Sequence, residues 1–112
     1  MFVSINRLTL KPGHEATLES RFAARGGLEA SPGFVSFQLL KRTWRPHHEG
    51  PESEIEYLAL TTWQTQADFF AWVDSPAFKA AHSGPKLDIW AGPAEPAGYT
   101  ERVRRNPANP EC

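Results

Sequence analysis

Four segments of the chain have the pattern of apolar residues that is typical of β-strands. Residues 2–10 alternate between two faces, and one of these faces is richer in large apolar side chains. Residues 34–40 are apolar on both faces, and we expect this strand to continue to about Trp44. Residues 55–63 are rich in β-branched and aromatic side chains, and a shorter strand is expected at residues 97–103.

The first helix is predicted between the first two strands. Residues 14–28 place Leu18 and Phe22 on one stripe, which is the spacing of an amphipathic helix. A second helical region follows the third strand, and a short helical turn is expected at residues 86–90.

The second helical region divides into two short helices. Thr65 followed by Asp68 is a capping pattern that predicts a helix start. Ser75 followed by Pro76 repeats this signal, because serine is a good N-cap and proline suits the first helical position. We therefore expect the chain to turn at this pair and to begin a third helix.

The order of elements is strand, helix, strand, strand, helix pair and strand. This βαββαβ order predicts an α+β, ferredoxin-like fold, in which an antiparallel sheet carries its helices on one face. Because the strand at 34–40 is apolar on both faces, we expect the uncovered face to meet a second copy in a homodimer. One domain is expected over residues 1–103, with an extended hairpin loop at 42–54 and a disordered tail at 104–112.

Composition narrows the class of protein. A chain of 112 residues with a net charge of −1 is one small domain, and the charge gives no support to nucleic acid or an acidic membrane as partner. The N-terminus has neither a basic segment nor an apolar stretch long enough for a signal peptide or a membrane span. The single cysteine, Cys112, is the last residue, so no internal disulfide is expected and a cytoplasmic setting is the default.

Two residues far apart in sequence are candidates for chemistry. Phe78 and His82 are four residues apart and share one face of the third helix, and the Ser-Gly-Pro that follows ends this helix. The His82 ring is therefore free to point into a cleft. Asn6 is a polar residue on the more apolar face of the first strand. It either bonds to backbone near a strand edge or donates a hydrogen bond into a dry pocket.

Other polar residues leave two interpretations open. Arg21 and Arg25 occupy the stripe that Leu18 and Phe22 should bury. They either pack their aliphatic stems with the guanidinium groups in water, or line the mouth of a cleft that takes an anionic ligand. The adjacent histidines at 47–48 lack a matching set of ligands, so a metal site there is the less favoured interpretation.

Several of these residues occur together in a recognisable arrangement: Asn6–Leu10, Arg21–Phe22, Ser31–Phe34, Trp63, Trp72 and Phe78–His82. In this arrangement the chain resembles the heme-degrading monooxygenases of the IsdG/MhuD type, within the antibiotic-biosynthesis-monooxygenase (ABM) superfamily. The resemblance covers residues 2–103, and the combination of Asn, Trp and His is its most specific part. The connection at 42–54 is longer than in such relatives.

The resemblance implies a dimeric α+β barrel in which heme is both substrate and cofactor. His82 would be the proximal iron ligand, and Asn6 would donate its amide toward dioxygen on the other side. Trp72 would press on the macrocycle and ruffle it. The heme propionates would meet Arg21 and Arg25, and the apolar pocket wall would include two aromatic residues, Phe22 and Phe78.

The implied reaction is oxidative cleavage of the porphyrin ring to a linear tetrapyrrole with release of iron. The chain has no glycine-rich nucleotide motif, so electrons would come from a partner reductase or a small external reductant. Two other classes stay open: a cofactorless monooxygenase acting on an aromatic polyketide or quinol, and a non-catalytic heme-binding protein. Asn6 favours catalysis over storage, and His82 favours heme over a metal-free substrate.

Overall fold

The computed structural model describes residues 1–24, 27–46, 55–82 and 86–108. The elements follow the predicted order: β1 Phe2–Leu10, α1 Glu15–Ala23, β2 Phe34–Lys41, β3 Ile55–Trp63, α2 Gln66–Val73, α3 Pro76–Ala81 and β4 Glu95–Thr100.

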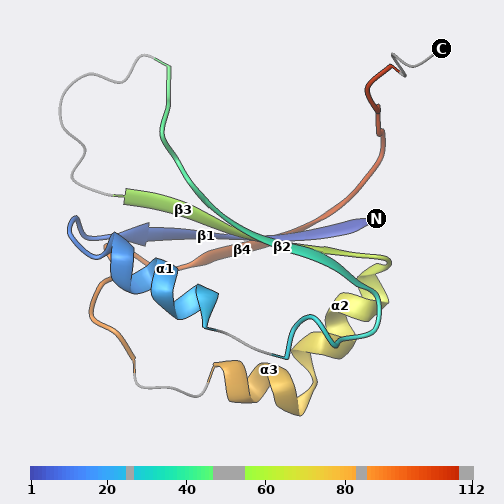
Figure 1. The fold of residues 1–112 in the computed structure, drawn as a ribbon, viewed down its shortest axis with the longest axis horizontal. Helices are drawn as coiled ribbons and strands as arrows, with labels where there is room; N and C mark the ends of the chain where they lie inside the picture. Colours follow the sequence, from blue (N-terminus) through green and yellow to red (C-terminus); the bar gives the residue numbers. More distant parts are fainter. Residues whose placement is uncertain (25–26, 47–54, 83–85, 109–112) are drawn as a thin grey trace.

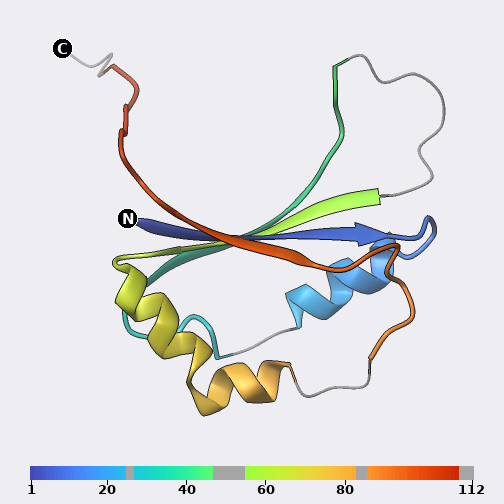
Figure 2. The ribbon, with the colours of Figure 1, turned by 180° about the vertical axis from the view of Figure 1, so that it is seen from behind.

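The four strands form one sheet in the order β2-β3-β1-β4, and every neighbouring pair is antiparallel. All three helices cover the same face of this sheet, as the two opposite views in Figure 1 and Figure 2 show. The α+β, ferredoxin-like βαββαβ fold expected from the sequence is thereby confirmed. In the described ranges, the other face of the sheet carries no helix, and we call it the uncovered face.

Some predicted boundaries were wrong. Helix α1 ends at Ala23 instead of continuing to residue 28, and Gly27, a few residues further on, has a φ of 87°, which a helix cannot contain. Strand β2 ends at Lys41 and does not reach Trp44. Strand β4 begins two residues earlier than predicted and ends at Thr100.

The helical turn expected at residues 86–90 does not form. This segment instead runs beside the end of β1, where Leu10 forms a bridge with Trp90. The amide of Lys11 donates to the carbonyl of Ile89 at 2.9 Å, and the amide of Ala91 donates to Thr9 at 2.8 Å. These long-range bonds satisfy backbone groups that a local helical turn would otherwise pair, so tertiary context overrides the local preference.

Two apolar clusters lie between the sheet and the helices. One is centred on Leu8, Leu10, Leu18, Tyr57 and Ile89, and the other on Phe2, Trp63 and Trp72. They contact opposite ends of β1, and the two residues of its covered face that lie between them, Ser4 and Asn6, belong to neither cluster. The middle of β1 is therefore where a cavity can open.

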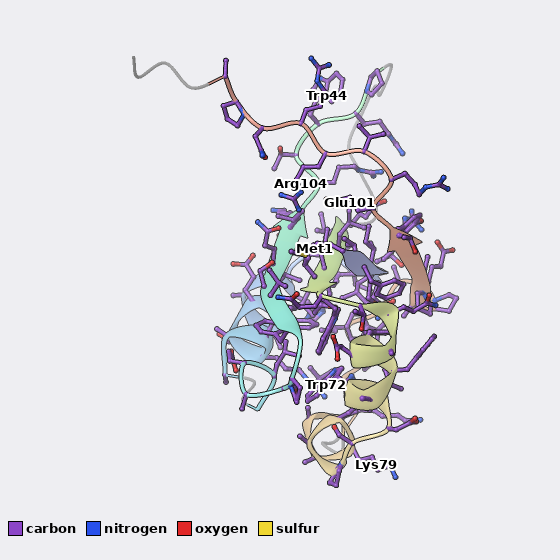
Figure 3. The ribbon with its side chains drawn as sticks, turned by 90° about the vertical axis from the view of Figure 1, so that its right-hand side faces the viewer. Met1, Trp44, Trp72, Lys79, Glu101 and Arg104 are labelled. Carbon is purple, nitrogen blue, oxygen red and sulfur yellow. The ribbon has the colours of Figure 1, made fainter. Side chains whose placement is uncertain are left out.

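On the other side of the sheet, two arms of chain extend away from the helices. Residues 42–46 continue from β2 and residues 101–108 continue from β4 (Figure 1). Figure 3 shows Trp44 and Arg104 on these arms, beyond the sheet from Trp72 and Lys79. Residues 47–54 of the predicted loop and residues 109–112 of the predicted tail lie outside the described residues. Within the described ranges, no helix is long and apolar enough to cross a membrane.

Candidate functional site

A cavity of about 390 Å³ lies between the sheet and the helices. Its floor is formed by side chains from the covered face of all four strands, and its walls by aromatic and aliphatic side chains of the three helices. Figure 3 shows Trp72 on the helix side of the sheet, where these walls stand. A volume of this size is typical of small-molecule sites. The cavity contains His82, Asn6, Trp72, Phe22 and Phe78, which are five of the residues singled out from the sequence.

His82 reaches the cavity from the end of α3, where it is the C-cap residue. Its Nδ1 lies 2.8 Å from the carbonyl oxygen of Phe78, and its ring stacks on the Phe78 ring at a centroid distance of 4.1 Å. Because a carbonyl only accepts hydrogen bonds, Nδ1 must carry the proton, which leaves the lone pair of Nε2 available. This arrangement, in which one ring nitrogen is bonded to the protein, is that of histidines that bind metals.

Asn6 reaches the cavity from the middle of β1, between Ala59 on β3 and Pro96 on β4. Its Oδ1 atom is buried and has no hydrogen-bond partner among the described residues. An unpaired buried amide oxygen costs about 1–3 kcal/mol, so a polar residue here needs a reason other than stability. Of the two interpretations of this asparagine, the cavity favours a side chain that is kept for a ligand over one that bonds to backbone.

Trp72 is 8% exposed and lies in the cavity wall on α2. Its indole stacks on Trp63 at 6.5 Å and meets the edge of Phe78 at 5.7 Å. Through Phe78 it also supports the ring of His82, because the three rings follow one another in contact. Trp72 is thus both a core residue and a surface of the cavity, where its packing makes it a rigid wall.

Arg21 lies in an adjoining hollow and not in the main cavity. This second hollow has a volume of about 640 Å³. It is bounded by β1, by α1 and by the segment from Lys86 to Ala94 that leads into β4. It shares Asn6, Phe22 and His82 with the main cavity, so the two spaces meet at these residues. Arg21 and Lys86 bring positive charge to it, and none of the described residues that line it is acidic. The second predicted arginine, Arg25, lies outside the described residues.

Two hydroxyl residues of the floor, Ser4 and Thr61, were not singled out from the sequence. Ser4 shares the face of Asn6 by simple alternation along β1, which was a usable signal. Thr61 could not be found in this way, because its place opposite Ser4 depends on the register between β1 and β3. Within the described ranges, no group of three or more His, Cys, Asp or Glu residues could hold a metal ion, and the histidines at 47–48 lie outside them.

Comparison with known proteins identifies relatives of the chain. Residues 1–84 match the family model described as antibiotic biosynthesis monooxygenase. A heme oxygenase (staphylobilin-producing) of Staphylococcus haemolyticus is 43% identical over 82 residues, which are 73% of this chain and 73% of that protein. A heme oxygenase (mycobilin-producing) of Mycobacterium tuberculosis is 39% identical over 87 residues, 77% of this chain and 74% of that protein.

Solved structures agree with these relatives. The heme-degrader MhuD of Mycobacterium tuberculosis, with two hemes bound in its active site, superposes with a TM-score of 0.68 at 34% identity. The match covers 95% of this chain and all of MhuD (100%). A Bacillus cereus protein assigned to the antibiotic biosynthesis monooxygenases superposes with a TM-score of 0.79, covering 96% of this chain and 97% of that one. At 19% identity, this second likeness shows the fold alone.

Proposed function

The chain belongs to the antibiotic biosynthesis monooxygenase family, and we propose that it is a heme-degrading monooxygenase that opens the porphyrin ring to a linear tetrapyrrole and releases iron. The names of its relatives support this proposal. Proteins at 39% and 43% identity are heme oxygenases, and a further relative from Shouchella clausii, at 33% identity over 85 residues, is a heme-degrading monooxygenase.

The observation that carries the proposal is that His82 and Asn6 line one cavity from different elements. His82 offers an imidazole nitrogen with its lone pair available, from the helix side. Asn6 offers a side-chain amide whose buried oxygen is unpaired among the described residues, from the sheet side. A flat apolar ligand between them would have a metal ligand on one face and a hydrogen-bonding group on the other.

The other residues of the site also suit heme. Aromatic and aliphatic side chains make up most of the cavity lining, which matches an apolar macrocycle. Arg21 and Lys86 stand in the adjoining hollow, where they can pair with carboxylates such as the heme propionates. Arg25 is proposed to join Arg21 in this role, as the resemblance implies.

Heme supplies the redox chemistry, and the protein supplies binding and orientation. His82 would hold the iron, and the hydrogen bond from its Nδ1 to the Phe78 carbonyl fixes the orientation of its ring. Asn6 would donate a hydrogen bond toward dioxygen, and Trp72, backed by Trp63, would press on the macrocycle. Dioxygen and an external reductant, either a partner reductase or a small molecule, complete the reaction.

We also propose that the chain acts as a homodimer through the uncovered face of the sheet. The strand registers place Ile5, Leu58, Leu60 and Leu40 side by side on this face. Leu40 is 42% exposed. Two apolar residues of the arms are more exposed, Trp44 at 77% and Val103 at 80%. An apolar surface of this kind favours a second copy of the chain as its cover.

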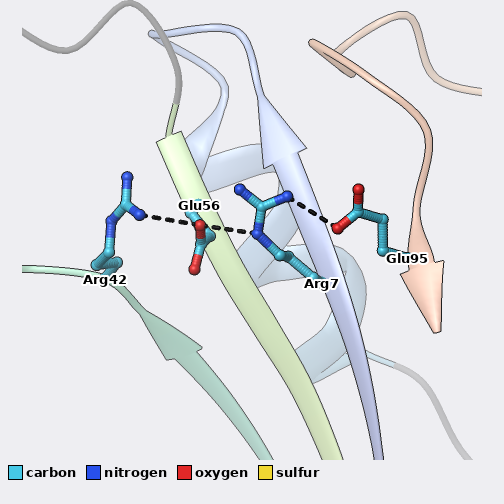
Figure 4. A network of polar contacts seen from close by, with 4 residues as sticks. All are labelled: Arg7, Arg42, Glu56 and Glu95. Carbon is cyan, nitrogen blue, oxygen red and sulfur yellow. Dashed lines mark hydrogen bonds and ion pairs between the residues drawn. The ribbon is translucent and has the colours of Figure 1, made fainter. Parts of the chain in front are cut away.

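One end of this face is charged. Glu56 on β3 accepts hydrogen bonds from the Arg7 Nε at 2.9 Å and from the Arg42 Nη1 at 3.1 Å. Arg7 also donates to Glu95 at 3.0 Å, so the network crosses from the end of β2 to β4 (Figure 4). Hydrogen bonds with Glu56 and then Glu95 raise the pKa of Arg7. A network fixed in this way limits which surfaces can pack there and gives the dimer one orientation.

The test of the heme proposal is an absorption titration of the purified protein with hemin, followed by ascorbate in air. Wild type is compared with His82→Ala, Asn6→Ala and His14→Ala, because His14 lies outside the cavity and controls for loss of a histidine. We expect a saturable Soret band that changes in His82→Ala, and decay of this band with ascorbate in wild type and His14→Ala but much less in Asn6→Ala.

Two results would contradict the proposal. A stable Soret band with no decay in the wild type would indicate a heme-binding protein without this activity. No saturable Soret band at all would exclude heme and direct attention to quinol or polyketide substrates.

A further inference from the structure

Two residues with hydroxyl side chains lie side by side on the floor of the main cavity. Ser4 and Thr61 are directly paired in the register between β1 and β3, and both line the cavity. Directly opposed residues of an antiparallel pair have Cβ atoms about 4.5–5.5 Å apart. No hydrogen bond joins the two hydroxyls in the described part of the chain, and two hydroxyls on neighbouring Cβ atoms suit one water molecule held between them.

The orientation of the Thr61 hydroxyl is set by its neighbour on the same strand. The indole Nε1 of Trp63 donates a hydrogen bond to the Thr61 oxygen at 2.9 Å. Trp63 is fully buried, at 0% exposed, so this donor has no access to solvent. Because the threonine oxygen already accepts this bond, its own proton is available to donate to something else.

The described residues give this pair one side-chain hydrogen bond, which is the bond from Trp63 to Thr61. Ser4 has no side-chain hydrogen bond within the described part of the chain, and Thr61 has only the bond from Trp63. The other floor residues beside them, Phe37 and Ala59, are apolar. The next polar group along β1 is Asn6, two residues from Ser4 on the same face.

We propose that Ser4 and Thr61 are positioning residues that hold one water on the cavity floor, next to Asn6. Thr61 donates to the water and Ser4 accepts from it, so the second proton of the water points up into the cavity. A small ligand on the sheet side of the heme then receives hydrogen bonds from this water as well as from Asn6. This inference rests on the proposed heme function and extends it to two further residues of the cavity floor.

The chain of donors runs in one direction, from the Trp63 indole to Thr61, to the water and to the ligand. Hydrogen bonds in series strengthen one another in a site of low dielectric constant. The hydroxyls contact the water and not the substrate, so they position a donor and are not themselves catalytic residues.

The test uses fluoride, an anion that binds ferric heme and accepts hydrogen bonds, with the hemin complex of the full chain. Variants are Ser4→Ala, Thr61→Val and the double variant, with Thr61→Ser as the conservative change that keeps a hydroxyl. Thr62→Val is the matched control, because Thr62 is the next residue on β3 and lies on the opposite face of the sheet. Thermal unfolding of each protein without hemin reports any loss of fold.

We expect Ser4→Ala and Thr61→Val each to weaken fluoride binding about fivefold, which corresponds to one hydrogen bond of about 1 kcal/mol. The double variant should lose no more than a single variant, because both hydroxyls hold the same water. Hemin affinity should change less than twofold in every variant. Thr61→Ser and Thr62→Val should bind fluoride as the wild type does.

Several results would overturn this inference. Wild-type fluoride affinity in Ser4→Ala would exclude the shared water even if Thr61→Val proved too unstable to study. Full additivity in the double variant would mean that the hydroxyls act separately. Loss of fluoride affinity in Thr62→Val would point to a general effect of the strand. If the wild type itself binds no hemin, the proposed function fails together with this inference, whereas normal hemin binding with unchanged fluoride affinity rejects this inference alone.

Discussion

At the scale of single residues, the backbone prepares side chains for their roles. The Phe78 carbonyl, one helical turn before His82, fixes the histidine tautomer so that the lone pair of the other ring nitrogen stays available. The Oδ1 atom of Asn6 is buried and has no hydrogen-bond partner among the described residues. Both features depend on a few atoms, and both can be changed by a single substitution.

Gly33 shows how closely the turn before β2 approaches α2. Its φ is 80°, and a Cβ atom there would lie 2.1 Å from the Asp68 carboxylate. We expect Gly33→Ala to lower the free energy of unfolding by about 1–2 kcal/mol for the backbone conformation and a further 1–3 kcal/mol or so for the collision. Chemical denaturation measures this loss.

Gly13→Ala is the matched control for this prediction. Gly13 has a similar φ of 95°, but a Cβ atom there meets nothing within 4 Å. The difference between the two variants therefore isolates the contact with Asp68. Equal losses in the two variants would show that the approach of Asp68 carries no cost.

The buried Tyr57 makes the stability of the fold depend on pH in the alkaline range. The residue is 2% exposed, and its hydroxyl donates a hydrogen bond to Glu19. Burial, and then the bond to Glu19, raise the pKa of Tyr57 well above its usual value of 10.0. As the pH rises above 10, the unfolded chain loses this proton while the folded chain keeps it, so the free energy of unfolding should fall.

Tyr57→Phe removes this titrating group, so the loss of stability above pH 10 should become shallower. Denaturation curves at several alkaline pH values measure the slope. Tyr99→Phe is the control, because Tyr99 is 54% exposed and should leave the wild-type slope unchanged. A slope that is the same in Tyr57→Phe and in wild type would contradict the assignment.

At the scale of elements, the junction between α2 and α3 positions the histidine. The Ser75 hydroxyl accepts a hydrogen bond from the Phe78 amide at 3.2 Å and donates one to the Trp72 carbonyl at 2.6 Å. This one side chain therefore begins α3 and ties it to the end of α2. The direction in which α3 leaves the junction places His82 over the cavity.

Ser75→Ala should lower the free energy of unfolding by about 1 kcal/mol, which is typical for loss of an N-cap. It should also weaken hemin binding, because α3 and His82 lose their anchor. Denaturation and Soret titration measure the two effects. Ser75→Asp should restore most of the stability, and Ser20→Ala on the exposed side of α1 should change neither quantity.

At the scale of the whole molecule, the two faces of the sheet differ in what lies against them. The helices cover one face and enclose the cavity, while the two arms extend on the other side (Figure 1). The uncovered face is apolar at its centre and charged at one end, where the Arg7 and Glu56 network lies. A partner that repeats this surface would bury the apolar centre.

Leu60→Arg should therefore produce a monomer. Leu60 pairs with Ile5 and Gln38 in the centre of the uncovered face, where an added charge opposes close packing. Size-exclusion chromatography with light scattering measures the mass. Gln66→Arg on the exposed surface of α2 adds the same charge and should remain a dimer. A monomeric wild type would contradict the proposed dimer.

The order of the helices and strands could be read from local patterns along the chain. Strand alternation, helical stripes and the Thr65 and Ser75 caps are local signals, so β1, β3, α2 and α3 were predicted almost to the residue. Asn6 could be singled out as a polar residue on the more apolar face of its strand, and His82 as a histidine in the last turn of its helix. Local signals were weaker at the ends of α1, β2 and β4, where tertiary contacts and turns decide the boundary.

Which side chains meet in the cavity depends on the folded arrangement of the strands and helices. The pairing of Ser4 with Thr61 requires the register of β1 against β3, and a shift by one residue would move every side chain to the other face. The helical turn predicted at residues 86–90 does not form, because the backbone of this segment is hydrogen-bonded to the end of β1. Strand register and the pairing of distant segments arise from long-range contacts. The pattern of residue types along the chain does not contain this information.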